Sequence, residues 1–136
     1  MNERTIARCI NIAKSLAPNN LSHRCSHVAF LVRGSRIAHI GINSDKTHPK
    51  TLDYNYDHYN ESLCRVHAEF RVILRSSVKE KTEDLSHYEL INVRIDRKGN
   101  INNGKPCRGC QHIISQMGIR RFYYTTAAGT VESEKI

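Results

Sequence analysis

Segments with helical spacing and segments with strand-like spacing alternate along this chain, and their order is the feature that most limits the fold. Apolar residues recur every three or four positions in three segments, which is typical of helices that bury one face. The first segment carries Ile6, Ile10, Ala13 and Leu16 and stops at Pro18, the second spans about 64–78, and the third spans 107–117 before Gly118.

Short apolar runs between these segments predict strands. The runs at 28–32 and 37–42 flank a tight turn and indicate an antiparallel hairpin, 88–95 and 119–126 are further strands, and residues 130–131 are compatible with a fifth. A helix between strands 88–95 and 119–126 favours a parallel pair. We therefore expect an α/β fold in which helices cover both faces of a mixed sheet of four to five strands.

The composition excludes several other classes of protein. With 39% apolar residues, the 136 residues are enough to bury a core as a single domain that spans 1–136. No apolar run approaches the roughly 18 residues that cross a membrane, and the polar start does not resemble a secretory signal. We expect a soluble, cytoplasmic protein that does not bind membranes, in which Cys9 and Cys25 are buried thiols.

Positive charge is in excess and is unevenly distributed. The formal net charge is +8, and six basic residues oppose only Glu3 between residues 1 and 36, whereas the segment 44–63 is slightly acidic. Such a balance is typical of proteins that bind polyanions such as nucleic acids. A solvated surface that only keeps the protein soluble explains the charge equally well.

Two short motifs do not follow from the folding pattern: His67-Ala68-Glu69 and Pro106-Cys107-Arg108-Gly109-Cys110. Two cysteines separated by two residues in the first turn of a helix lie on the same side, and the helix N-terminus favours the thiolate that binds metal. One imidazole and two thiolates leave the fourth position of a tetrahedral zinc open, as in catalytic sites. Cys64 is the alternative fourth ligand, which would make the zinc structural.

Glu69 is the candidate proton acceptor beside such a zinc, because water activated by zinc must lose a proton. Residues two apart do not share a face of a regular helix. His67 and Glu69 therefore converge only if both lie at the beginning of the helix.

The spacing H-x-E followed by P-C-x-x-C resembles the signature of the zinc-dependent cytidine/deoxycytidylate deaminase superfamily. Gly41-Ile42-Asn43 is similar to the glycine-x-asparagine of that superfamily. The resemblance implies a three-layer α-β-α cytidine deaminase-like fold, zinc held by His67, Cys107 and Cys110, and Glu69 as the proton shuttle.

The same resemblance gives candidate substrate contacts. Asn43 would hydrogen-bond the sugar or base, and Ala68, Pro106 and Arg108 lie next to the metal and catalytic positions in the sequence. Tyr56, in the loop 44–63, either stacks on a base or holds the loop against the protein. His48 and His58 are candidates for a second metal site in the same loop.

Only ten residues follow Thr126. In this respect the chain resembles the branch of the superfamily in which the last two strands form a hairpin, as in cytidine deaminases. His67 departs from that branch, which usually has cysteine as its first ligand.

The reaction implied is the zinc-dependent hydrolysis of cytosine to uracil with release of ammonia. The positive net charge favours a cytosine within a nucleic-acid strand, in single-stranded or duplex DNA or in RNA. Free cytidine, deoxycytidine or deoxycytidylate is the alternative substrate. A catalytically inactive, zinc-stabilised nucleic-acid-binding module is the alternative from another class, and the sequence leaves the oligomeric state open.

Overall fold

The computed structural model describes residues 1–17, 25–43 and 67–136. The elements follow the predicted order, with boundaries within a few residues of those expected. They are α1 (Glu3–Leu16), β1 (Cys25–Arg33), β2 (Arg36–Ile42), α3 (Ala68–Glu80), β3 (Glu89–Asp96), β4 (Ile101–Asn102), α4 (Arg108–Gln116), β5 (Arg121–Thr125) and β6 (Val131–Lys135). None of the helices in the described part is long and apolar enough to cross a membrane.

The strands form one mixed sheet in the order β2-β1-β3-β5-β6. The hairpin of β1 and β2 is antiparallel, β3 and β5 are parallel, and β6 returns antiparallel to β5, so the predicted pairings are confirmed. The short strand β4, which the sequence did not predict, pairs with the end of β3. A strand of two residues is too short for its hydrophobic alternation to be recognised in a sequence.

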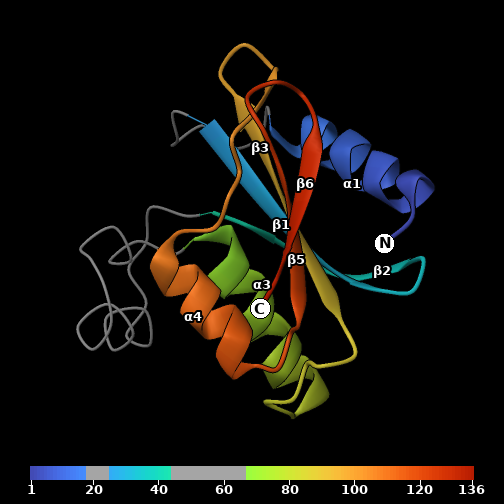
Figure 1. Cartoon of the computed structure of the whole chain (residues 1–136), viewed down its shortest axis with the longest axis vertical. Helices are drawn as coiled ribbons and strands as arrows, with labels where there is room; N and C mark the ends of the chain where they lie inside the picture. Colours follow the sequence, from blue (N-terminus) through green and yellow to red (C-terminus); the bar gives the residue numbers. More distant parts are fainter. Residues whose placement is uncertain (18–24, 44–66) are drawn as a thin grey trace.

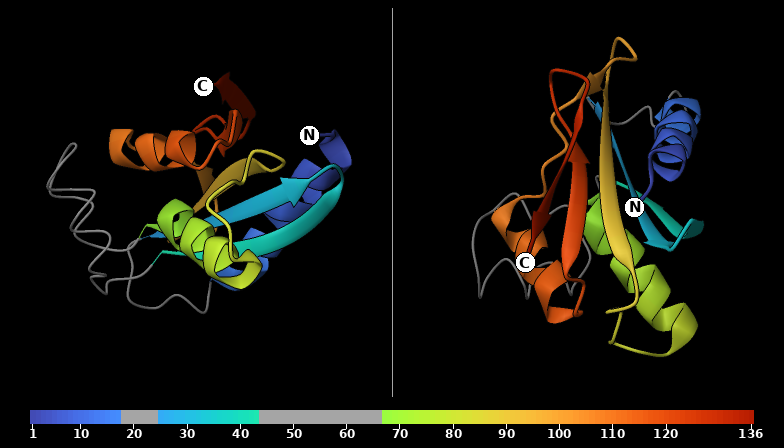
Figure 2. Two further views of the ribbon diagram at one scale, coloured as in Figure 1. Left: turned by 90° about the horizontal axis from the view of Figure 1, so that it is seen from below. Right: turned by 45° about the vertical axis from the view of Figure 1, so that its right-hand side comes forward.

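The sheet is the middle of three layers, as Figures 1 and 2 show, and the predicted α-β-α architecture is confirmed. Successive side chains of a strand point to opposite faces. On β1, Phe30 packs on the side of α1, where it meets Cys9 and Ala13, whereas Leu31 packs on the side of α3 and α4. Burying a side chain such as Phe30 contributes about 1.5–3 kcal/mol to folding. The two helices that carry the sequence motifs therefore share one face of the sheet.

Candidate metal and catalytic site

A glycine on β2 lets the first turn of α3 approach the sheet closely. A Cβ atom on Gly41 would lie 2.7 Å from the backbone N of Val72 and 3.0 Å from the backbone O of Ala68. Both atoms belong to helix backbone and cannot rotate away, so a larger residue at 41 would push α3 outward. The glycine of the Gly41-x-Asn43 motif thus brings the beginning of α3 next to the end of β2.

His67 and Glu69 converge because His67 precedes the helix. His67 is the N-cap of α3 and has extended backbone angles, φ −74° and ψ 155°, whereas Glu69 lies in the first turn. The angular spacing of a regular helix does not apply across an N-cap. His67 and Glu69 thus both lie at the beginning of the helix, which is the condition for their side chains to meet.

The Pro-Cys-x-x-Cys motif is built in the same way on α4. Cys107 is the N-cap, with φ −68° and ψ 168°, and Cys110 lies in the first turn. The two thiols and the ring of His67 meet across the gap between α3 and α4. The Nδ1 atom of His67 lies 3.7 Å from Sγ of Cys107 and 3.4 Å from Sγ of Cys110, and all three ligand atoms lie within 4.8 Å of one another.

These distances fit zinc. Bonds of about 2.0 Å from zinc to nitrogen and about 2.3 Å to sulfur, at tetrahedral angles, separate the nitrogen from each sulfur by roughly 3.6 Å. The two observed separations fall on either side of that value. Within the described ranges, this is the one group of three or more potential ligand side chains close enough to hold a metal ion.

The thiols differ in acidity. A side-chain hydrogen bond from Cys110 lowers the pKa of Cys107 to about 4, and the same bond, together with burial, raises the pKa of Cys110. Cys107 is therefore the first of the two to become the thiolate that a metal binds. By contrast, burial raises the pKa of Cys9 to about 12, and Cys9 lies on α1 in the core between this helix and the sheet, as expected for an inert thiol.

The carboxyl group of Glu69 is almost completely buried, with 3% of the residue exposed. Burial raises the pKa of Glu69, and the carboxyl shares a side-chain hydrogen bond with Cys110. A buried carboxyl whose pKa is raised toward neutrality can both accept and release a proton. Its contact with Cys110 puts it beside the potential metal ligands.

Asn43 is anchored to β1 just after β2 ends. Its Oδ1 accepts a hydrogen bond of 3.0 Å from the backbone N–H of His27, and its own N–H donates to the carbonyl of His27 at 3.1 Å. The side-chain oxygen and the backbone N–H of Asn43 therefore both hold the end of β2 to β1.

A buried asparagine that sequence reasoning missed connects this region to the cysteine motif. The Nδ2 atom of Asn92, on β3, donates to the carbonyl of Gly104 at 2.8 Å and lies 3.2 Å from Nδ1 of His27. Gly104 itself fits closely on the sheet, because a Cβ there would lie 2.9 Å from the backbone O of Asn92. The available signal was an asparagine between the apolar residues Ile91 and Val93 of a predicted strand.

The other predicted substrate contacts lie in different environments. Ala68 is fully buried and belongs to the core beneath α3. Pro106 is buried, and its carbonyl accepts a hydrogen bond of 2.8 Å from the side chain of Gln111. Arg108 is exposed at the first position of α4. Tyr56, His48, His58 and Cys64 lie outside the described residues.

No protein-family model and no curated protein matches the chain. Solved structures do match it. They include the cytidine deaminase from Burkholderia pseudomallei, with a TM-score of 0.62, 15% identity, and coverage of 99% of this chain and 93% of the other. The deoxycytidylate (dCMP) deaminase of the cyanophage S-TIM5 has a TM-score of 0.56 and 17% identity, and covers 93% of this chain and 86% of its own.

The cytidine deaminase from Mycobacterium leprae matches with a TM-score of 0.54 and 16% identity, over 94% of this chain and 92% of the other. All of these matches extend over nearly the full length of both proteins, so the likeness concerns the whole arrangement of sheet and helices rather than one motif. The chain therefore has the cytidine deaminase-like fold that its motifs predicted.

Proposed function

We propose that this chain is a zinc-dependent hydrolytic deaminase that converts cytosine to uracil and releases ammonia. The observation that carries the proposal is the meeting of His67, Cys107 and Cys110 at the ends of two helices, beside the buried Glu69. His67, Cys107 and Cys110 would hold the zinc, and the fourth position would remain for water. When bound in such a site, zinc lowers the pKa of a coordinated water molecule to about 7.

Glu69 would carry the protons of the reaction. Its carboxylate accepts a proton from the attacking water and delivers it to the ring nitrogen next to the carbon that bears the amine. It then takes the second proton from the same oxygen, now bonded to the ring carbon, and transfers it to the amine. The carbon–nitrogen bond breaks and ammonia leaves, so that cytosine and water become uracil and ammonia. The raised pKa of Glu69 supports this role, because the group must take up and release a proton near neutral pH.

The size of the substrate separates two versions of the function. The net charge of +8 favours a cytosine within a nucleic-acid strand, in DNA or RNA. The names of the structural neighbours, which are cytidine and dCMP deaminases, favour a free nucleoside or nucleotide. Asn43 would contact the sugar or base in either case, and Arg108, exposed beside the cysteines, would approach a phosphate.

The test compares the zinc-loaded protein with its Glu69→Gln variant on cytidine, dCMP, single-stranded DNA, duplex DNA and RNA. We expect the unmodified protein to release ammonia and form uracil from at least one of them. We expect Glu69→Gln to lose this activity by at least about 100-fold, the lower end of what a positioned acid–base group contributes.

Zinc content and melting temperature serve as the controls, and both should be unchanged in Glu69→Gln because the ligands remain. Equal activity of the two proteins would contradict the role of Glu69. Stoichiometric zinc without deamination of any of these substrates would favour a zinc-stabilised binding module instead.

A further inference from the structure

Three exposed cations form a line along α3. Arg71, Arg75 and Lys79 are four residues apart, so they lie on one side of the helix, and all three are exposed. At a rise of 1.5 Å per residue, the line extends about 12 Å along the helix axis. We call these three residues the α3 stripe.

The α3 stripe begins one helical turn from the candidate metal site. The backbone N–H of Arg71 donates to the carbonyl of His67 at 3.0 Å, so Arg71 follows the candidate ligand by one turn. From there the stripe leads away from the site toward the other end of α3. A chain that lies along the stripe can therefore have one of its units at the site.

The two arginines are held in place by the neighbouring strand. Nη1 of Arg71 donates to the carbonyl of Ile42 at 3.4 Å, and Nη1 of Arg75 donates to the carbonyl of Ile40 at 3.3 Å. β2 is an edge strand of the sheet described here, so these bonds also cover carbonyls at an edge. Each guanidinium has five N–H donors, and one bond to a carbonyl leaves four for an anion.

A hollow runs beside the stripe, between α3 and β2. It has a volume of about 290 Å³ and is lined by Arg75 and Lys79 from the helix and by 38–40 from the strand. This volume is close to the lower end of small-ligand sites, about 300 Å³. The hollow therefore offers two cations over a concave surface rather than over a convex one.

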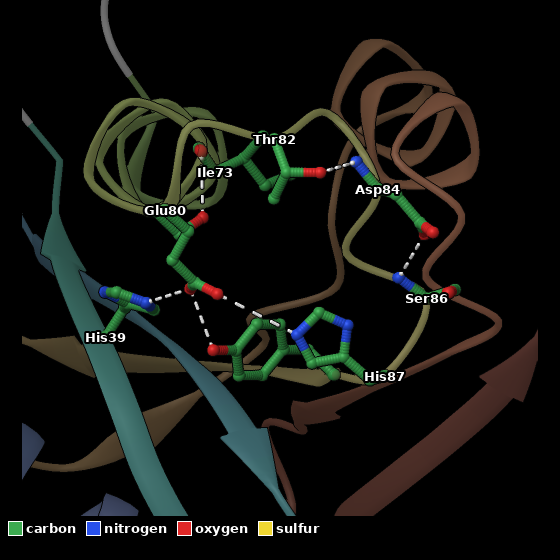
Figure 3. Close-up of polar contacts among 9 residues, drawn as sticks. His39, Ile73, Glu80, Thr82, Asp84, Ser86 and His87 are labelled. Carbon is green, nitrogen blue, oxygen red and sulfur yellow. Dashed lines mark hydrogen bonds and ion pairs between the residues drawn. The ribbon is translucent and has the colours of Figure 1, made fainter.

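Acidic side chains of the described residues do not neutralise the stripe. Among the described residues, none of the three cations forms an ion pair. Glu80, the next residue on the helix, turns its carboxylate to His39 and His87, as Figure 3 shows, and accepts a hydrogen bond of 2.8 Å from Tyr88. As far as the described acidic residues are concerned, the positive charge of the stripe is thus left for an anionic partner.

We propose that the α3 stripe binds the phosphates of a single-stranded nucleic acid while one of its cytosines occupies the candidate site. This inference rests on the proposed function and assigns its substrate class. A free nucleotide has its phosphate at one point and needs one cation, whereas three cations spaced by about 6 Å suit successive phosphates of a strand. A single strand also presents its base without the cost of extruding it from a duplex.

The experiment uses the variant Arg75→Gln/Lys79→Gln, which removes the two cations at the hollow and keeps the ligands, Glu69 and Arg71. The matched control is Arg4→Gln/Arg8→Gln. It removes two exposed cations, also four residues apart, from α1 on the opposite face of the sheet. Binding of a labelled single-stranded oligonucleotide is measured by fluorescence anisotropy over a range of salt concentrations, and deamination of the same oligonucleotide and of dCMP is measured in parallel.

We expect Arg75→Gln/Lys79→Gln to bind the oligonucleotide about tenfold more weakly and to deaminate dCMP, if the protein accepts it, at the rate of the unmodified protein. Loss of two phosphate contacts should reduce the slope of log affinity against log salt by about 1.4. The control should behave like the unmodified protein. Equal binding and equal salt slopes in the two variants would overturn the inference, as would a protein that deaminates dCMP but does not bind the oligonucleotide.

Failure of the proposed function gives a different result. In that case no substrate releases ammonia. The affinities of the two variants for the oligonucleotide can still be compared, because fluorescence anisotropy does not depend on turnover.

Discussion

At the scale of single residues, Asn92 connects three parts of the protein that are distant in sequence. It is 1% exposed on β3, its Nδ2 donates to the carbonyl of Gly104, and it lies beside the ring of His27 on β1. Gly104 precedes the cysteine motif by two residues, and the backbone of His27 holds Asn43. One buried amide therefore joins the segments that carry the candidate metal ligands and the candidate substrate contact.

We predict that Asn92→Ala lowers the free energy of unfolding by about 1–3 kcal/mol. The substitution leaves the carbonyl of the buried Gly104 without this donor, and an unsatisfied buried polar group costs about that much. Urea unfolding followed by circular dichroism measures the change. Asn11→Ala, on the exposed side of α1, is the control and should change stability by less than about 0.5 kcal/mol. Similar values for the two variants would show that the Asn92 bond adds nothing.

At the scale of secondary-structure elements, the C-terminal end of α3 is tied to the sheet by Glu80. Its carboxylate contacts His39 on β2 and accepts a hydrogen bond from Tyr88 just before β3 (Figure 3). The bond from Tyr88 and then the bond from His39 hold the pKa of Glu80 below its usual value. The helix that begins at the candidate site thus has polar ties to the sheet near its other end.

This tie predicts a dependence of stability on pH. Because the pKa of Glu80 is lower in the folded than in the unfolded protein, its contribution is complete above the unfolded pKa of about 4.3 and is lost as the pH falls through the folded pKa. We expect Glu80→Gln to be less stable than the unmodified protein above about pH 5 and the difference to shrink below about pH 4. Urea midpoints across this range measure it.

Glu83→Gln, an exposed residue in the turn that follows α3, is the control and should have the midpoint of the unmodified protein at each pH. A deficit of Glu80→Gln that stays the same at low pH would mean that the carboxylate charge plays no part in the tie.

At the scale of the whole molecule, the candidate metal would join the two helices that cover one face of the sheet. His67 precedes α3 and Cys107 precedes α4, and 40 positions separate them in the chain. Only the folded protein brings these ligands together, so a metal held by them would bind the folded state in preference to the unfolded one. Metal binding and folding would therefore be coupled.

We predict that removing zinc with a chelator lowers the melting temperature by about 10 °C. Zinc at about 1,000 times its dissociation constant stabilises the folded state by about 4 kcal/mol. Cys107→Ser should lack most of this shift because it loses a ligand. Cys9→Ala, which removes a buried thiol from the opposite face of the sheet, should keep the shift although it destabilises the core. Differential scanning calorimetry with and without chelator measures both, and an equal shift in Cys107→Ser would contradict the ligand set.

Much of the architecture was predictable because helices and strands produce local patterns of apolar residues in the sequence. The spacing of Ile6, Ile10 and Ala13 predicts α1, and the runs of apolar residues predict β1, β3 and β5, since each element must bury one face or both. The parallel pairing of β3 and β5 followed from the helix between them. β4 was not predicted because a strand of two residues is too short to show a hydrophobic alternation.

The sequence by itself determined which residue types are available for the chemistry: one imidazole, two thiols and one carboxyl in two motifs of recognisable spacing. Only the tertiary structure decided that they meet. His67 reaches Cys107 and Cys110 because Gly41 admits α3 close to β2 and because His67 and Cys107 are the N-caps of α3 and α4, which no spacing along the chain encodes. The tie through Asn92 and the line of cations beside β2 likewise depend on how separate elements pack. The periodicity of apolar residues in the sequence indicates which face each element buries. The distances between atoms of different elements arise from how the elements pack together.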